Sequence, residues 1–127
     1  MEIDIRNGLP YTTLTIGYNS QSVDISNILI DTGSASTILA ADIVADIGIL
    51  PFEDEILYTI RGVGGTEVVF IRETNFIKIG NKTLFQFEIE IGAMNYGFDI
   101  NGILGMDFLI KSQACINIHR QIVTFGT

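Results

Sequence analysis

The sequence predicts an all-β fold that closes into a barrel-like sheet and carries one or two short helices. Three observations support this prediction: apolar and polar residues alternate with a period of two, many short strand-like runs follow one another, and turn residues separate them. Such spacing is typical of a closed or sandwiched β domain. With 127 residues, 47% of them hydrophobic, the chain is expected to form a single domain over residues 1–127.

The strand predictions rest on the spacing of apolar side chains. Phe85, Phe87, Ile89 and Ile91 occupy every second position of one run, and residues 13–18 follow the same pattern. The unbroken apolar run 28–30 is expected of a strand that is covered on both faces. Further strands are expected at residues 2–6, 23–25, 56–61, 67–72, 75–79, 114–118 and 121–125.

Two stretches are predicted to be helical. Residues 40–47 place Ile43 and Ile47 on one helix face, and Gly48 is suited to end that helix. A second short helix is expected at residues 106–111. Asp107 would lie in its first turn, where a carboxylate is favourable, and we do not expect this residue to be catalytic.

The charge of the chain argues against several classes of partner. Fifteen acidic and seven basic residues give a net charge of −8, which opposes binding to nucleic acid or to an anionic membrane surface. The chain has no apolar run of membrane-spanning length and no signal-peptide pattern, so we expect a soluble, cytoplasmic protein. Residues 53–55 form a short acidic run that is expected to be a solvated loop.

Cysteine and histidine each occur once, as Cys115 and His119. No intrachain disulfide is therefore possible, and a zinc site, which needs three or four ligands, is not expected. On a strand the two residues would share a face but lie too far apart to form a hydrogen bond, which argues against a catalytic thiol. We expect Cys115 to be buried among its apolar neighbours, and we expect no metal or other cofactor.

The most informative segment is residues 28–34, ILIDTGS. A strand that leaves the core here would place Asp31 at its end, and Gly33 would allow a tight turn. The tripeptide alone also fits an ordinary strand-to-turn transition. The apolar residues before Asp31 and the hydroxyl residue Ser34 after the glycine make a functional site the stronger interpretation.

Two further segments contain glycines at potentially functional positions. Residues 101–109 carry two apolar residues and Gly105 before the second predicted helix, a pattern that by itself also fits a buried strand ending in a turn. Residues 59–67 contain three glycines between two predicted strands, which indicates a hairpin with a mobile tip. A phosphate-binding loop is the poorer interpretation, because a strand rather than a helix follows the glycines. A flexible hairpin without function remains open.

Taken in order, these three segments resemble the retropepsin-like aspartic proteases, over roughly residues 23–125. The likeness is greatest to the retropepsin-like domain of the DNA-damage-inducible ubiquitin-shuttle proteins. That domain also has a short helix after the active-site loop, a Gly-x-Asp-x-Leu element and a Gln-Ala-Cys-x-Ile-type strand, which match residues 105–109 and 113–116 here. The resemblance implies the closed acid-protease fold and cleavage of a peptide or protein substrate.

The resemblance also implies that Asp31 is the catalytic residue, and the chemistry requires a second carboxyl. One group must take a proton from water while another protonates the carbonyl oxygen of the amide, and two close carboxyls share a proton. Because the chain is short and has one Asp-Thr-Gly, a symmetric homodimer is expected. By resemblance, the Thr32 hydroxyl would reach the partner's backbone and Gly33 would allow close approach of substrate. The Ser34 hydroxyl can bond the carboxylate, which would shift the working pH towards acid.

The remaining site residues are also implied by resemblance. The flap would comprise Arg61, Gly62, Val63, Gly64 and Gly65. At its tip, the Val63 N–H would hold a water against the bound peptide.

Apolar substrate pockets would be lined by residues near Ile38, Ile103 and Leu104, which implies a hydrophobic preference around the scissile bond. Met106 stands where retroviral members carry an arginine that braces the dimer, so that brace is absent. The chain ends, residues 1–6 and 121–127, are expected to form an intersubunit sheet.

Three functions therefore follow from the sequence. The first is a homodimeric aspartic endopeptidase. The second is a non-catalytic peptide-binding or dimerisation module that retains the fold, and the third is a monomeric β-barrel that binds a small molecule.

Overall fold

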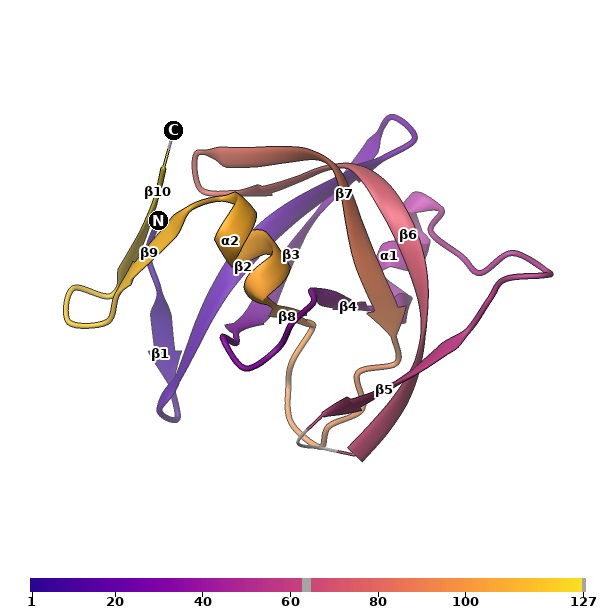
Figure 1. The fold of residues 1–127 in the computed structure, drawn as a ribbon, viewed down its shortest axis with the longest axis horizontal. Helices are drawn as coiled ribbons and strands as arrows, with labels where there is room; N and C mark the ends of the chain where they lie inside the picture. The colour runs from indigo at the N-terminus through magenta and orange to yellow at the C-terminus, as the bar shows by residue number, and fades with distance from the viewer. Residues whose placement is uncertain (63–64, 127) are drawn as a thin grey trace.

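The computed structural model describes residues 1–62 and 65–126, and Figure 1 shows the course of the chain. In chain order the elements are β1 (Asp4–Arg6), β2 (Leu9–Tyr18), β3 (Gln21–Ile30), β4 (Ile38–Ala40), α1 (Ala41–Val44), the 3-10 helix η1 (Ala45–Ile47), β5 (Tyr58–Gly62), β6 (Gly65–Ile79), β7 (Lys82–Gly92), β8 (Gly102–Leu104), α2 (Met106–Lys111), β9 (Ala114–Asn117) and β10 (Ile122–Phe125).

Eight of the described strands form one sheet, in the order β1-β2-β3-β8-β4-β7-β6-β5. Strand β2 also pairs with β6, through Thr15 with Lys78, Ile16 with Ile77 and Gly17 with Phe76. This extra pairing closes the sheet from β2 to β6 into a barrel, with β1 and β5 attached outside the ring (Figure 1). The predicted all-β, barrel-like architecture with short helices is confirmed.

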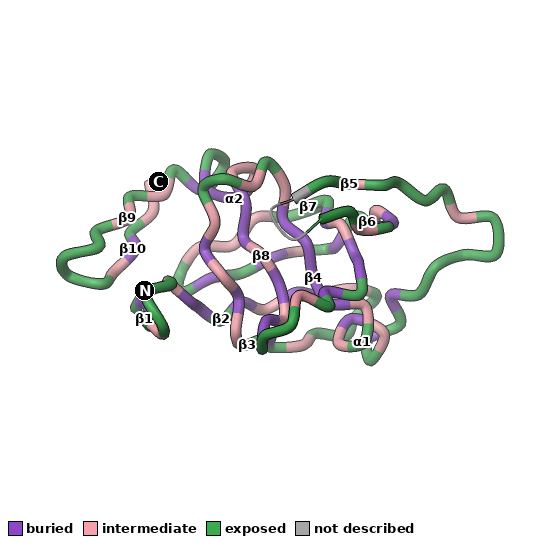
Figure 2. Tube along the Cα trace, turned by 90° about the horizontal axis from the view of Figure 1, so that it is seen from below, coloured by how far each residue is buried: buried purple, intermediate pink, exposed green. Residues whose placement is uncertain are grey.

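Buried aliphatic and aromatic side chains from most strands and from α2 form one core cluster inside the barrel. Figure 2 marks the buried residues along the chain. Phe87, Ile89 and Ile91 of β7 are buried, as their alternation predicts. Phe85 is instead 75% exposed, so its predicted burial is wrong. The cause lies at Gln86, whose left-handed φ of 53° interrupts the alternation.

Two strands each contain two runs that the sequence predicts as separate strands. The runs 67–72 and 75–79 belong to the single strand β6, and the runs 23–25 and 28–30 both lie in β3. Polar residues separate the runs without breaking the strands. At Asn27 of β3 the backbone takes a left-handed φ of 58°, close to a shift of register against β2. The hydrogen-bonded pairing of β2 with β3 therefore continues on both sides of this irregularity.

The short helices lie where they are predicted. Residues 41–47 form α1 and η1, and Gly48 ends them with a left-handed φ of 88°. Helix α2 has the predicted bounds. Asp42 and Asp46 are exposed, as expected for like charges on a surface helix. Over the described residues, no helix is both long and apolar enough to cross a membrane.

The acidic run at residues 53–55 is only partly the solvated loop that its composition predicts. The first two acids are exposed, but a Glu55 carboxylate oxygen lies 2.5 Å from Nη2 of the buried Arg72. The same Arg72 nitrogen donates a hydrogen bond of 3.1 Å to the Leu50 carbonyl, and its guanidinium stacks on the Phe52 ring. Arg72 therefore ties the segment that precedes β5 to strand β6.

The two chain ends lie side by side (Figure 1). Strands β9 and β10 pair with one another, and the first residues join β10 through the hydrogen bonds Ile3 N–H to Gln121 O and Val123 N–H to Met1 O, both 2.8 Å. The ends thus pair within one chain, and the expected pairing between subunits stays a prediction.

The single cysteine lies in this terminal sheet. Cys115 is exposed, which corrects the expected burial. Its neighbours Ala114 and Ile116 point to the core, so alternation along β9 turns Cys115 outwards.

Candidate active site

Asp31 lies directly after β3, at the point where the chain leaves the barrel. Strand β3 runs parallel to β8, with Ile30 opposite Leu104, and the Asp31 amide donates a 3.0 Å hydrogen bond to the Leu104 carbonyl. The side chain is half-buried, and its Oδ1 accepts a 2.8 Å hydrogen bond from the Gly33 amide. Its Oδ2 accepts no hydrogen bond from any described residue.

The turn after Asp31 is closed by its own backbone, because the Ser34 amide donates to the Asp31 carbonyl at 3.2 Å. Thr32 and Gly33 are exposed. The Ser34 hydroxyl donates to the Ser36 carbonyl at 2.7 Å. Since a hydroxyl has one proton to donate, the expected bond from Ser34 to the Asp31 carboxylate is not formed.

The start of α2 and the residue before it bind the turn that follows Asp31. The amides of Met106 and Asp107 donate to the carbonyls of Ser34 and Ala35, at 2.8 and 3.2 Å. The approach requires a glycine at position 105, because a Cβ there would lie 2.3 Å from the Ser36 carbonyl oxygen. The first and third sequence motifs along this part of the chain, residues 28–34 and 101–109, are therefore one structural unit.

A carboxylate–threonine pair fastens that unit together. Asp107 accepts hydrogen bonds from the Thr37 amide and hydroxyl, at 3.1 and 2.8 Å. The Thr37 hydroxyl also accepts a hydrogen bond of 3.1 Å from the Gly105 amide. Asp107 does lie in the first turn of α2, as expected, but its main role is to hold the Asp31 loop against β8 and α2.

Comparison with protein families places the Asp-Thr-Gly turn, the glycine hairpin and the start of α2 within one matched span. Residues 12–108 match the model of the aspartyl protease family. The chain belongs to the aspartyl protease family. A search of curated proteins found no match. The all-β barrel with short helices is the acid-protease fold, and the matched span contains the Asp31 turn, the β5–β6 hairpin and the start of α2.

The predicted hairpin is present in this member of the aspartyl protease family. Strands β5 and β6 pair antiparallel, with Arg61 opposite Thr66 and Gly62 opposite Gly65. Gly65 has a φ of 113°, a left-handed value that favours glycine. Val63 and Gly64, the predicted tip of the flap, lie outside the described residues. The role of this hairpin as a flap stays a prediction.

The predicted pocket residues differ in how much surface they present. Ile38 and Ile103 face one another in the antiparallel pair β4–β8. Ile38 is 3% exposed and Ile103 is half-buried, so Ile103 offers the larger surface to a substrate. Leu104 is 1% exposed and packs in the main core. Its predicted pocket role is therefore corrected to a core role, because alternation along β8 turns it inwards.

The described residues form a recess on the surface beside the active-site turn, and another lies further from it. The one beside the active-site turn has a volume of about 380 Å³ and is lined by Thr32, Met106, Leu109, Ile110, Gln113, Ala114 and Ile116. Apolar side chains from α2 and β9 dominate its wall, and Ile110 is 66% exposed. This recess therefore joins the Asp-Thr-Gly turn to an apolar surface.

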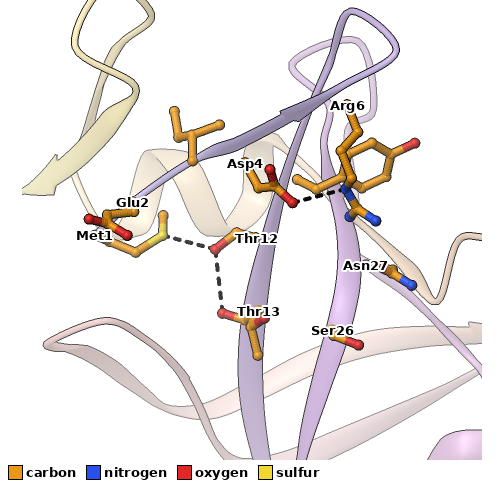
Figure 3. Close-up of a pocket in the computed structure, with 10 residues that line it drawn as sticks. Met1, Glu2, Asp4, Arg6, Thr12, Thr13, Ser26 and Asn27 are labelled. Atoms are coloured by element: carbon orange, nitrogen blue, oxygen red, sulfur yellow. Dashed lines mark hydrogen bonds and ion pairs between the residues drawn. The ribbon is translucent and has the colours of Figure 1, made fainter.

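The other recess, of about 520 Å³, lies between the N-terminal segment, β2 and β3 (Figure 3). Arg6 stacks over the Tyr11 ring there, and its Nε lies 3.0 Å from an Asp4 carboxylate oxygen. Thr12 donates a hydrogen bond to the Met1 sulfur. This recess contains none of the predicted site residues, so its larger volume does not make it the site of the chemistry.

One polar cluster near the hairpin was missed by the sequence reasoning. Glu67 of β6 accepts a 2.7 Å hydrogen bond from the Met94 amide and a short one from the Tyr96 hydroxyl. Ser36, which lies in the loop from Asp31 to Thr37 (the active-site loop), donates to Glu90 of β7. Burial, the hydrogen bond and charge of Glu67, and the charge of Glu90 raise the pKa of Tyr96. No local pattern joins these four segments, so the sequence contains no signal for the cluster.

Across residues 1–62 and 65–126, no three acidic, cysteine or histidine side chains gather in a way that could hold a metal ion.

Proposed function

We propose that the chain is an aspartic endopeptidase that acts as a homodimer, with one Asp31 from each copy. The observation that carries the proposal is the placement of Asp31. The carboxylate is fixed at the end of a barrel strand, held through Oδ1 by the Gly33 amide, while Oδ2 has no described hydrogen-bond donor. A family match over residues 12–108 supports the same activity.

The reaction needs two carboxyls in different protonation states. The ionised one takes a proton from water, whose oxygen then bonds the carbonyl carbon, while the protonated one gives its proton to the carbonyl oxygen. Collapse of this intermediate breaks the C–N bond as a proton passes to the leaving nitrogen. No covalent bond to the protein forms at any step.

The second carboxyl is proposed to come from a second copy. Asp107 and Glu90, the acids that bond the active-site loop among the described residues, already accept hydrogen bonds from Thr37 and Ser36. The chain has one Asp-Thr-Gly triplet in 127 residues. A two-fold axis beside Asp31 would supply an identical carboxyl from a second copy, without any further catalytic residue in the chain.

The apolar recess beside Thr32 supports the position of that axis. Two copies that meet there would cover Ile110 and the neighbouring apolar wall while bringing their Asp-Thr-Gly turns together. Thr32, which is exposed on the recess, would then reach the partner's backbone. With Met106 in place of an arginine, burial of apolar surface rather than an ion pair would hold the two copies together.

Substrate is proposed to lie as an extended strand between the hairpin and the paired Asp31 residues. Main-chain pairing would give affinity, and apolar surface near Ile103 and Ile38 would favour hydrophobic side chains. In these features the chain is similar to the retropepsin-like domain of the DNA-damage-inducible ubiquitin-shuttle proteins. The filled barrel interior leaves little support for a small-molecule carrier.

The proposal is tested with Asp31→Asn in a peptide-cleavage assay scanned from acid to neutral pH. Asparagine keeps an oxygen for the Gly33 amide, so the fold is expected to survive. Cleavage should fall by about a thousandfold, because both carboxyls of the dimer are lost. Asp46→Asn, at an exposed helical position, is the matched control and should cleave normally.

Mixing experiments test the dimer separately from the chemistry. Excess Asp31→Asn chain should depress the activity of the unaltered chain, because mixed dimers contain one carboxyl, and activity per chain should fall on dilution. If the unaltered chain cleaves no peptide at any pH, the peptidase proposal fails and the non-catalytic module replaces it. If mixing and dilution have no effect on an active chain, the dimeric mechanism fails.

A further inference from the structure

The Glu67 junction, defined as Glu67, Met94 and Tyr96, connects the hairpin strand β6 to the loop 93–101 between β7 and β8. One Glu67 oxygen accepts the Met94 amide at 2.7 Å, and the other accepts the Tyr96 hydroxyl. Figure 1 shows this loop running beside β5 and the start of β6. A single carboxylate therefore holds two points of the loop against the hairpin, at the level of the Ile60–Glu67 pair.

The junction holds a residue in a conformation that it would not adopt readily by itself. Met94 has a left-handed φ of 62° although it is not a glycine, and it is 4% exposed. Such a conformation costs on the order of 1 kcal/mol and persists only where the surroundings fix it. The Met94 amide donates to Glu67, its carbonyl accepts from the Tyr96 amide at 3.2 Å, and its side chain packs in an apolar cluster, so the bond to Glu67 is one of the contacts that fix this conformation.

Gly92 is required for the junction to form. A Cβ at this position would lie 2.6 Å from a Glu67 carboxylate oxygen and 3.2 Å from a Val69 methyl carbon. The bare backbone of β7 thus makes the space into which the Glu67 carboxylate fits.

The Met94 side chain connects the junction to the proposed substrate side of the molecule. Met94 packs in a second apolar cluster with Ile38, Val69 and Ile100, and the half-buried Ile103 and Ile60 pack against that cluster. Ile103 is half-buried and offers the proposed apolar substrate surface, the buried Ile38 belongs to the cluster that supports it, and Ile60 lies on the hairpin. A displacement of Met94 would therefore move that surface.

A second contact joins the same region to the active-site loop. Ser36 donates to Glu90, whose backbone amide donates to the Thr37 carbonyl at 2.9 Å. The negative charges of Glu67 and Glu90 help to keep the Tyr96 hydroxyl protonated as a donor. Ser36 and Thr37 of the loop after Asp31 are thus tied to β7, the strand that leads into the loop 93–101.

We propose that Glu67 is a positioning residue for substrate: through Met94 and Tyr96 it fixes the loop 93–101 and hence the apolar surface at Ile103, which the cluster around Met94 and Ile38 supports. The inference rests on the proposed peptidase function only for the identity of the ligand, an extended peptide with large apolar side chains. Glu67 does not touch the reacting atoms and takes no part in proton transfer.

Hydrogen exchange tests the structural half of the inference without any activity. In Glu67→Ala the amides of residues 93–101 should exchange about tenfold faster or more, since a hydrogen bond to a charged group is lost at Met94. Glu67→Gln keeps an oxygen for the Met94 amide and should restore most of the protection. Glu73→Ala removes an exposed carboxylate from the same strand and should change nothing in this loop.

Peptide binding and kinetics test the functional half. In the Asp31→Asn background, which should not cleave, the Kd for a fluorescent peptide with large apolar residues should rise about fivefold or more with Glu67→Ala and remain unchanged with Glu73→Ala. In the active chain, Glu67→Ala should raise KM by a similar factor with kcat within about twofold. Gly92→Ala should have the same effect, because it displaces the carboxylate without removing it.

If the amides of residues 93–101 exchange at the same rate in Glu67→Ala as in the unaltered chain, Glu67 does not hold this loop and the inference is wrong. Faster exchange with unchanged Kd would overturn its role in substrate positioning, and equal losses in kcat and kcat/KM would do the same. Failure of the peptidase proposal is a different result, in which the unaltered chain cleaves nothing while exchange and Kd still respond to Glu67→Ala.

Discussion

Replacing Thr37 with valine tests whether the pair Thr37–Asp107 holds the active-site loop. Valine keeps the shape of the side chain but removes a hydroxyl that is 0% exposed. That hydroxyl donates to the Asp107 carboxylate at 2.8 Å and accepts from the Gly105 amide at 3.1 Å. The charged hydrogen bond contributes about 2 kcal/mol and the orphaned amide costs about 1 kcal/mol, so the free energy of unfolding should fall by about 3 kcal/mol.

The control is a second buried threonine with a simpler environment. Thr74 is 1% exposed and its hydroxyl donates only to the Phe87 carbonyl, at 2.8 Å. Thr74→Val should therefore cost about 1 kcal/mol. Urea unfolding followed by far-ultraviolet circular dichroism measures both variants, at one fixed protein concentration because a dimer is proposed. If Thr37→Val destabilises the chain no more than Thr74→Val does, the reasoning about the active-site loop is refuted.

Two further predictions concern Gly105, before α2, and Tyr96, in the loop between β7 and β8. Gly105→Ala should lower Tm by about 10 °C and abolish peptide cleavage. The reason is that the added Cβ would lie 2.3 Å from the Ser36 carbonyl oxygen, which belongs to backbone that cannot move aside. A calorimetric Tm equal to that of the unaltered chain would contradict this packing argument. The raised pKa of Tyr96 means that the folded chain holds this proton more tightly than the unfolded chain, so stability should fall as the pH rises above the unfolded value of about 10. Tyr96→Phe should reduce that fall in urea titrations at high pH, and an identical pH dependence in the two chains would contradict the assignment.

Local periodicity predicted most of the elements, because the direction of a side chain along a strand or helix depends on neighbouring residues alone. Helix α2, the hairpin β5–β6 and the position of Asp31 after a buried strand all follow from patterns of a few residues. The failures at Phe85 and Cys115 have a related cause. At Phe85 a left-handed neighbour changed the alternation, and at Cys115 the apolar flanks pointed to the opposite face.

The polar contacts of the site could not be predicted in this way. Asp107 and Thr37 are 70 positions apart, and Glu67 and Tyr96 are 29 apart, so their pairing depends on how the barrel closes. The partner of the Ser34 hydroxyl cannot be predicted from the motif, because the hydroxyl could donate either to the Asp31 carboxylate or to a backbone carbonyl. The structure has it donating to the Ser36 carbonyl.

The parallel pairing of β3 with β8 has a consequence for biosynthesis. Ile30 lies opposite Leu104, so strand β3 leaves the ribosome on the order of ten seconds before its neighbour exists, at typical rates of translation. During that interval the strand that precedes Asp31 presents one unpaired edge and large aliphatic side chains to solvent or to any chaperone nearby. The nascent chain, more than the finished barrel, is then the state in which this protein is most vulnerable to aggregation.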